Sequence, residues 1–415
     1  MNLKARSVRS WGRLDMRSEW RLSTINEICS LVTDGAHNSP KSVINGAYMA
    51  SVKDFTEYGL DFSSCRMISE EDYEKLRLQG CVPEFNDILV GKDGARYFED
   101  IIIYKQPEKP ALLSSIAILR TDRKKVIPEF LYYTLKSPSV RKDVRDNYGS
   151  GSAIPRIVLK DFKRMPIAFP PIDEQKKLVS IFVSIDEQIQ NNNKINNNLQ
   201  EQARALYRSW FVDFEPFDGS KPSNWKNGRL KDVLSLQRSS IKAGENTSLP
   251  YLPIDIIPMN TFGLSDVKPN EEAQSSLITF SKDDIVIGAM RVYFHRVIIA
   301  PFDGITRTTC FTLRPFNADY LGFSLLCCDQ DSSIEYAQQT SKGSTMPYAV
   351  WDGGLGDMEI PIPDPKTAHR FNEIVMPMIR IIQSSFAENK NLRELRDSLL
   401  PRLMSGELDV SDLDL

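Results

Sequence analysis

The segment between Pro170 and Asp218 constrains the fold more than any other part of the chain. It opens with two prolines, which end the preceding element because proline fixes φ and lacks an amide donor, and Asp173 then stands where a helix N-cap is expected. Apolar side chains recur behind Asp173 mostly at steps of three and four residues, with no glycine or proline before Pro216. The spacing predicts one helix of about 40 residues, or about 60 Å at 1.5 Å per residue.

A helix of that length cannot bury a narrow apolar seam within one compact domain, so it needs a partner helix of similar length. The segment 364–406 carries a matching seam, and we expect the two helices to pair antiparallel as a coiled coil. The expected seam residues are Leu178, Phe182, Ile185, Ile189, Asn192, Ile195 and Leu199 in the first helix and Ile382, Phe386, Asn389, Leu392, Leu395 and Leu399 in the second.

A shift of 197 residues overlays the two seams and places Asn192 on Asn389. A polar residue within such a seam lowers stability but fixes register and partner choice. The alternative is that Asn192 lies at the solvent edge of the seam. The second helix also contains Pro377, which is expected to kink it.

The length, composition and net charge of the chain are those of an ordinary globular protein of two to three domains. The chain has 415 residues, is 41% hydrophobic and 26% charged, and carries a net charge of −3, so any DNA-binding surface must gather its cations locally. No apolar run approaches the 18 residues that a membrane span needs, and residues 1–19 lack the apolar core of a secretory signal. Six cysteines without C-x-x-C spacing favour a reducing cytoplasm with free thiols.

The chain repeats its plan. In the first globular segment, β-like runs are expected at 30–33, 87–90, 101–104 and 115–119, followed by a helix from 128 to about 144 and a glycine-serine loop at 149–155. After Gly219 the same series of strand and turn motifs returns. Asp284–Gly288 repeats Asp87–Gly91, and 342–347 repeats 150–155. Between these matched points the two segments differ strongly, which indicates one scaffold with two different recognition surfaces.

The repeat predicts an α+β protein in which two globular α/β-mixed domains are separated by two long antiparallel helices, with a pseudo-two-fold internal repeat. The expected boundaries are a lead-in at 1–19, a first domain at 20–170, a first helix at 171–215, a second domain at 216–363, a second helix at 364–406 and a tail at 407–415.

Catalytic motifs are missing from the sequence. The three histidines, His37, His295 and His369, have no metal-ligand spacing, and no phosphate-binding loop or nucleophile elbow occurs. Asp364 followed by Glu388 and Lys390 has the residue types of a magnesium nuclease, but residues two apart on a helix face different directions. We therefore expect a chain without catalytic residues, resident metal or cofactor of its own.

Basic residues stand beside glycine turns at matching points of both domains. Loop-borne Lys and Arg, interleaved with aromatics such as Tyr97 and Tyr293, suit contacts to phosphates and base edges, although for each residue a solvated surface charge is the ordinary alternative. The candidate DNA-binding residues are Lys41, Lys92, Arg96, Arg156, Lys160, Arg291, Arg296, Arg307 and Lys342.

The sequences of the two long helices resemble those of the specificity subunits of type I restriction-modification systems. The similar segments run from PPIDEQKKLV to FVDFEPFDG and over the closing LRELRDSLLPRLMSGELDV. The phrases VTDGAHNSP and DILVGKDG are similar to target-recognition domains of that family. The resemblance extends over essentially the whole chain from about residue 20.

The resemblance implies a non-catalytic subunit whose two domains each read one half of a bipartite double-stranded DNA site, while the helices set the gap between the halves. The implied partners are two modification subunits, which use S-adenosylmethionine to methylate adenine, and motor-nuclease restriction subunits, which use ATP and Mg. A membrane partner is not expected. The alternative is a coiled-coil adaptor that binds proteins and does not read DNA.

Overall fold

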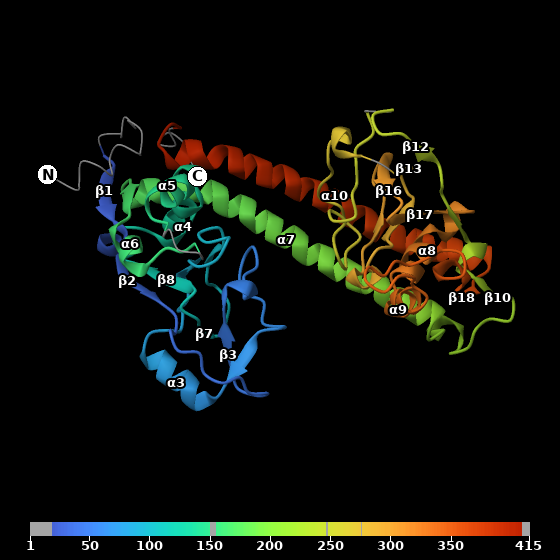
Figure 1. Ribbon diagram of the computed structural model, residues 1–415, viewed down its shortest axis with the longest axis horizontal. Helices are drawn as coiled ribbons and strands as arrows, with labels where there is room; N and C mark the ends of the chain where they lie inside the picture. Colours follow the sequence, from blue (N-terminus) through green and yellow to red (C-terminus); the bar gives the residue numbers. More distant parts are fainter. Residues whose placement is uncertain (1–18, 150–154, 246–247, 275, 409–415) are drawn as a thin grey trace. The chain divides into compact units, whose positions relative to one another are not determined.

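The computed structural model describes residues 19–149, 155–245, 248–274 and 276–408. The expected lead-in, most of the glycine-serine loop and most of the C-terminal tail lie outside these residues. The chain divides into two compact units, which we call unit 1 (residues 1–186 and 394–415) and unit 2 (residues 187–393). The division falls within each long helix, so each helix contributes a shorter part to unit 1 and a longer part to unit 2. Figure 1 shows the two helices as α7 and α10.

Unit 1 contains a four-stranded sheet in the order β2-β8-β5-β6, a three-stranded sheet β4-β3-β7 and the antiparallel pair β1-β9. Its strands are β1 Arg21–Thr24, β2 Cys29–Asp34, β3 Ala47–Ala50, β4 Arg66–Ile68, β5 Ile88–Gly91, β6 Ile101–Ile103, β7 Ala111–Leu112, β8 Ile116–Thr121 and β9 Pro166–Phe169. Its shorter helices are α2 Ile25–Ile28, α3 Glu70–Leu78, α4 Pro128–Lys136, α5 Pro138–Asn147 and α6 Leu159–Arg164.

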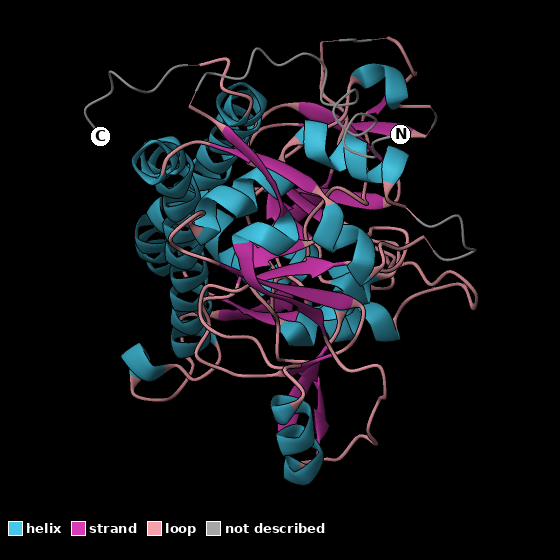
Figure 2. Cartoon of the chain, turned by 90° about the vertical axis from the view of Figure 1, so that its left-hand side faces the viewer, coloured by secondary structure: helices cyan, strands magenta, loops and turns pink. Residues whose placement is uncertain are grey.

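Unit 2 repeats this inventory of sheets with β11-β17-β14-β15, β12-β13-β16 and β10-β18. Figure 2 shows the strands of the chain in magenta and its helices in cyan. The strands of unit 2 are β10 Lys226–Arg229, β11 Leu234–Leu236, β12 Ser240–Ile241, β13 Leu277–Phe280, β14 Ile285–Gly288, β15 Val297–Ile299, β16 Gly304–Arg307, β17 Cys310–Pro315 and β18 Glu359–Ile362. Its shorter helices are α8 Leu321–Cys328 and α9 Asp331–Gln339.

The four strands expected in the first domain are confirmed as β2, β5, β6 and β8. The single helix expected from 128 to about 144 is wrong, because the chain forms α4 and α5 with a break at Ser137. Ser137 has φ −63° and ψ 141°, an extended conformation. The following Pro138 disfavours the helical region for the residue before it and cannot donate a helical hydrogen bond.

In each unit one inner strand of the four-stranded sheet is buried on both faces. We call this strand, β5 in unit 1 and β14 in unit 2, the central strand. In β5, Ile88 and Val90 pack into one core and Leu89 into another. In β14, Ile285 and Ile287 pack into one core and Val286 into another. This burial explains why the strands read as continuous apolar runs rather than as alternating patterns.

The same ion pair precedes the central strand in both units. Asp87, 1% exposed, accepts two hydrogen bonds from Arg120 of β8 at 2.9 and 2.8 Å. Asp284, also 1% exposed, accepts two from Arg314 of β17 at 2.6 and 2.8 Å. These hydrogen bonds raise the pKa of both guanidinium groups. Bidentate pairs are geometrically specific, so they fix β8 against β5 and β17 against β14 in the same way.

The long helices are α7 Ile172–Phe211 and α10 Pro365–Met404, each 40 residues long. They pair antiparallel, because residues late in α7 contact residues early in α10. In unit 2 the Phe211 and Phe371 rings lie 4.7 Å apart, and the Asn192 amide donates to Asn389 Oδ1 at 2.9 Å. In unit 1 Arg396 Nη1 donates to Asp186 Oδ1 at 2.7 Å.

Asn192 and Asn389 are 5% and 2% exposed, so neither lies at a solvent edge. They face each other across the helix pair, whereas the sequence overlay treated them as equivalent points of the repeat. The helices start and end 193 residues apart (365 − 172 and 404 − 211), which makes Asn196 the repeat equivalent of Asn389. The sequence overlay used a shift of 197 residues and was therefore wrong by four residues, or about one helical turn. Such an error preserves the apolar pattern, because residues four apart lie on nearly the same face of a helix.

The expected seam divides between three environments. Leu178, Phe182, Ile185, Ile189 and Ile382 are at most 8% exposed. Leu199, Phe386, Leu392 and Leu399 are partly buried. Ile195 and Leu395 are 41% and 49% exposed, so they lie outside the buried face. Much of the seam packs into the cores of the globular units as well as against the other helix, and this widens the buried face beyond a coiled-coil stripe.

One local expectation for the long helices needs correction. Asp173 does not cap α7, since the helix begins one residue earlier at Ile172 and Asp173 lies in its first turn. Pro377 lies within α10, which is continuous from Pro365 to Met404, and the kink expected there stays a prediction. Pro377 is exposed, so water can reach the carbonyl group that loses its helical partner there.

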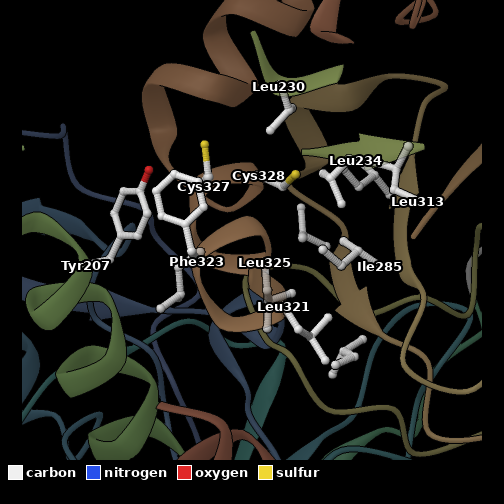
Figure 3. Close-up of a cluster of buried hydrophobic side chains, with 14 of the residues drawn as sticks. Tyr207, Leu230, Leu234, Ile285, Leu313, Leu321, Phe323, Leu325, Cys327 and Cys328 are labelled. Carbon is white, nitrogen blue, oxygen red and sulfur yellow. The ribbon is translucent and has the colours of Figure 1, made fainter. Parts of the chain in front are cut away.

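The largest core of unit 2 joins α7, α8 and α10. Tyr207 of α7 lies beside Phe323 and Cys327 of α8, with 5.8 Å between the centroids of its ring and that of Phe323 (Figure 3). All six cysteines are buried and free, and burial raises the pKa of Cys327 to about 11. Within the described residues, no helix is long and apolar enough to cross a membrane.

Candidate nucleic-acid interface

In unit 1 the loop that follows β5 is joined to the segment that precedes α6. The Gly94 N–H donates to the Pro155 carbonyl at 3.0 Å, and the Ile157 N–H donates to the Lys92 carbonyl at 2.9 Å. Gly94 has φ +98° and begins a turn in which the Tyr97 N–H donates to the Gly94 carbonyl at 3.0 Å. We call residues 92–98 the unit 1 loop.

Unit 2 builds the same arrangement from different residues. The Arg291 N–H donates to the Pro347 carbonyl at 2.9 Å, and the Ala349 N–H donates to the Ala289 carbonyl at 2.8 Å. The Phe294 N–H donates to the Arg291 carbonyl at 2.9 Å and so closes the same turn. We call residues 289–295 the unit 2 loop. The two loops share their main-chain contacts and differ in nearly every side chain, as expected of a scaffold that presents variable contacts.

Each loop has two left-handed residues four positions apart: Gly94 and Phe98 in unit 1, Arg291 and His295 in unit 2, where φ is +51° and +50°. Glycine adopts this conformation freely, whereas Arg291 pays about 1–2 kcal/mol for it. Strain of this kind often accompanies a functional side chain. Arg291 is exposed and is flanked by Tyr293 and Phe294, which are 44% and 37% exposed.

Seven of the nine candidate DNA-binding cations are exposed. Arg96 is paired with Asp100 at 2.7 Å and lies 3.6 Å from Glu99, so part of its charge is balanced within the loop. The exposed candidates are Lys41, Arg96, Arg156, Lys160, Arg291, Arg307 and Lys342.

Lys92 and Arg296 differ from the expectation of loop cations that point to solvent. Lys92 is 6% exposed and its ammonium lies 3.4 Å from Asp34 and 3.6 Å from Asp93. Arg296 donates from Nη1 to main-chain carbonyls of the segment 254–257, and its guanidinium lies 5.6 Å from the Phe294 ring centroid. Both cations hold the base of their loop, a role decided by partners distant in sequence.

His295 belongs to a buried polar cluster that sequence reasoning missed. Its Nε2 lies 2.9 Å from the Asp329 carbonyl and 3.0 Å from Asp329 Oδ1. Arg204 of α7 donates to the same carboxylate at 2.6 and 3.0 Å. A cavity of about 410 Å³ adjoins this cluster and is also lined by Arg208 and Asp331. The three side chains come from three separate segments, so spacing carried no signal.

Unit 1 has its own buried polar cluster, centred on Asp186. Tyr133 donates to Asp186 Oδ2 at 2.7 Å, and Arg396 donates to Oδ1. Burial would lower the pKa of Arg396, but the Asp186 and Asp397 carboxylates raise it. Lys136 lines the adjoining cavity of about 480 Å³, and burial lowers its pKa to about 8. The sequence could have indicated this cluster, because Asp186 and Arg396 stand among the apolar positions of the two long helices.

The residue types that suggested a magnesium nuclease have separate structural roles. Asp364 accepts hydrogen bonds from the Lys366 and Thr367 N–H groups and so caps α10. Glu388 accepts a hydrogen bond from Asn192 at 3.0 Å, and Lys390 lies 3.1 Å from Asp266. The three side chains do not converge on one point.

Comparisons with known proteins found related sequences. A sequence model described as the type I restriction modification DNA specificity domain matches residues 17–201. The MjaIX type I restriction enzyme specificity subunit of Methanocaldococcus jannaschii is 26% identical over 317 residues, covering 69% of this chain and 71% of that protein. The HindI specificity subunit of Haemophilus influenzae is 23% identical and covers 68% of this chain and 78% of that protein.

The fold is also similar to a solved structure. The S subunit of a type I restriction-modification system from M. genitalium aligns with a TM-score of 0.60 at 16% identity, over 95% of this chain and 98% of that one. The repeated units, the paired helices and the comparisons lead to one conclusion: residues 17–201 match the type I restriction modification DNA specificity domain, and the chain is similar in sequence to the specificity subunits of type I restriction-modification systems and shares the fold of a solved one.

Proposed function

We propose that each unit of this chain reads one half of a bipartite double-stranded DNA site through the loop that follows its central strand. The observation that carries the proposal is the shared main-chain geometry of the unit 1 and unit 2 loops, which present unlike side chains. Arg96 in unit 1 and Arg291, Tyr293 and Phe294 in unit 2 are exposed there. Arginine reads guanine edges or phosphates, and aromatic rings contact bases and sugars.

The long helices α7 and α10 would set the gap between the half-sites and dock the partner subunits. A 40-residue helix spans about 60 Å, which exceeds the 34–36 Å between successive turns of one duplex face. The chemistry would belong to two modification subunits that bind S-adenosylmethionine and to restriction subunits that use ATP and Mg, all acting on DNA in the cytoplasm. Methylation of a base requires it to leave the stack, so a reader only has to position the duplex.

An exchange of domains tests the two-reader proposal. Residues 20–165 are replaced by the corresponding segment of another specificity subunit, and the hybrid is expressed with its methyltransferase partner. Modification-sensitive sequencing of the cellular DNA then gives the methylated motif. One half-site is expected to change while the other is retained. Change in both halves or in neither would contradict modular reading, and absence of any motif would favour a protein-binding adaptor.

A helix insertion tests the spacer separately. Seven residues inserted near Asn197, with seven at the facing position of α10, keep the buried face aligned because seven residues make nearly two turns. The helices lengthen by about 10 Å, so the gap is expected to grow by about three base pairs at 3.4 Å each. The same sequencing readout measures the gap, and an unchanged gap would show that the helices do not set it.

A further inference from the structure

The two loops end on residues of different chemistry at the same backbone position. In unit 1 the second left-handed residue is Phe98, which is 2% exposed and lies with its ring centroid 5.9 Å from that of Phe162. In unit 2 it is His295, which is 9% exposed. An apolar contact therefore anchors the unit 1 loop, and a titratable group anchors the unit 2 loop.

The hydrogen bonds of His295 define which nitrogen carries a proton. Nε2 faces two acceptors, the carbonyl and the carboxylate of Asp329, so it must donate. Nδ1 lies 3.6 Å from Asp331 Oδ1, and the Asp331 side chain is 89% exposed. When Nδ1 is also protonated, the ring becomes a cation between two carboxylates. Asp329 is 1% exposed, so its attraction is weakly screened.

Charged groups on every element packed around His295 enter this balance. Asp329 follows α8, and Asp331 begins α9. Arg204 of α7 binds Asp329 and opposes a second positive charge. Arg208 and Glu201, also of α7, line the same cavity. Three carboxylates and two guanidinium groups therefore surround the ring, and the carboxylate of Asp329 makes the shortest contact with it.

The main chain at His295 is tied to α7 by a second route. The Asn260 N–H donates to the His295 carbonyl at 2.9 Å, and the Gln200 amide of α7 donates to the Asn260 carbonyl. Gln200 is 8% exposed. The end of the unit 2 loop is thus held on both its side chain and its main chain, while Arg291, Tyr293 and Phe294 remain exposed.

We propose that His295 is a positioning residue for DNA recognition by unit 2. It holds the unit 2 loop against Asp329, and it does so more firmly when its ring is protonated. The inference rests on the proposed function of the loops. It follows that binding of the half-site read by unit 2 weakens as the pH rises, whereas binding of the half-site read by unit 1 lacks this dependence.

The direction of the pH effect follows from the fold. Burial works against the charge on His295, but the hydrogen bonds and charge of Asp329 outweigh it, so its pKa is raised above the ordinary 6.5. A group whose pKa rises on folding stabilises the held loop below its ordinary pKa. That contribution is lost as the pH rises through the raised value. The size of the affinity change depends on how far the pKa of His295 differs between the held and the released loop.

The test uses the full chain bound to its methyltransferase partner and duplexes in which one half-site of the methylated motif is scrambled. Affinity for each duplex is measured between pH 6 and pH 8.5. The duplex that keeps the half-site of unit 2 is expected to bind up to about tenfold more weakly at the upper end. The duplex that keeps the half-site of unit 1 reports every other effect of pH and is expected to change less.

Three variants assign the effect. His295→Gln is expected to flatten the profile, and Asp331→Asn, which leaves the Asp329 contacts intact, is expected to move it to lower pH. His369→Gln is the matched control: its pKa is also raised, by Asp319 and Glu373, but it lies on α10 outside the cluster. It is expected to keep the wild-type profile.

A wild-type slope in both His295→Gln and Asp331→Asn would overturn the proposal. So would an equal slope on both duplexes. NMR of histidine-labelled protein gives an independent readout, because the chain has three histidines and the two glutamine variants assign their signals. A His295 pKa at or below 6.5 would also overturn the proposal. If the wild-type complex binds neither half-site duplex at any pH, the proposed function itself is contradicted.

Discussion

The three-stranded sheets of the two units are built differently, although the four-stranded sheets beside them correspond strand for strand. In unit 1, β3 pairs parallel with β7 and antiparallel with β4. In unit 2, β13 pairs antiparallel with both β12 and β16. Unit 1 also places helix α3 beside this sheet. The duplication has kept the sheet that carries the loop and its bidentate ion pair, and it has let the neighbouring sheet diverge.

The helix pair shows a second contrast. Its part in unit 1 buries an ion pair, Asp186 with Arg396, supported by Tyr133. Its part in unit 2 buries amides, Asn192 with Asn389, supported by Glu388. Both devices satisfy buried polar groups and fix register, but a charge left without its partner is more costly than an amide. The four predictions below test how alike the units are.

The largest effect is expected from aromatic residues of the long helices that fill the core of each unit. Phe182→Ala in unit 1 and Phe371→Ala in unit 2 each remove a side chain that is 0% exposed, and each is expected to lower the free energy of unfolding by about 3–5 kcal/mol. Ile195→Ala is the control, since Ile195 is 41% exposed, with an expected loss below about 1 kcal/mol. Urea unfolding measures all three, and unequal losses in the two units would show that one core is not held by its helix.

A somewhat smaller effect is expected from breaking the ion pair of unit 1. Arg396→Met leaves Asp186, 5% exposed, with its tyrosine donors Tyr58 and Tyr133 but without the guanidinium that contacts it, and is expected to destabilise the chain by about 3 kcal/mol. The double variant Asp186→Leu with Arg396→Met removes both charges and is expected to recover most of that loss. If the double variant is as unstable as the single one, the pair contributes through packing and not through charge.

The corresponding change in unit 2 is expected to be milder. Asn389→Leu removes one of the two acceptors of the Asn192 amide while Glu388 remains, so the expected cost lies at the low end of the about 1–3 kcal/mol for an unpaired buried donor. The double variant with Asn192→Leu is expected to be closer to wild type in urea unfolding. If Asn389→Leu lowers the free energy of unfolding more than Arg396→Met does, the proposed contrast between the two parts of the helix pair is reversed.

The smallest effect on stability, with a clear effect on binding, is expected at the unit 2 loop. Arg291→Gly places in unit 2 the residue type that unit 1 has at Gly94, so it relieves left-handed strain and is expected to raise stability by up to about 1 kcal/mol. Loss of the cation is expected to weaken DNA binding about tenfold and to reduce the slope of log affinity against log salt by about one.

Asn86→Gly is the matched control for Arg291→Gly, because Asn86 is also left-handed, with φ +72°, carries no charge and lies outside both loops. It is expected to leave the affinity and its salt dependence unchanged. If both variants bind DNA as the wild type does, Arg291 is not a DNA contact and its strain has another origin.

Much of the fold was readable before the structure, because the relevant signals are local and repeated. The strand at Ile88–Gly91 and its counterpart at Ile285–Gly288 follow Asp and end in Gly, and the long helices show a regular apolar period. The break between α4 and α5 was also local, since Pro138 announces it, and it was overlooked. Register was less accessible, because a shift of one helical turn preserves the seam.

The sequence by itself determined the duplicated order of elements, the length of the two helices and the turns that carry the loops, since period, proline and glycine act on their near neighbours. Only the tertiary structure decided the fate of individual charges. Lys92 is buried because Asp34 approaches it, Arg296 is occupied by carbonyls about 40 residues away, and His295 meets Asp329. Whether a side chain reaches DNA or holds its own loop depends on contacts between distant segments, and no local pattern specifies them.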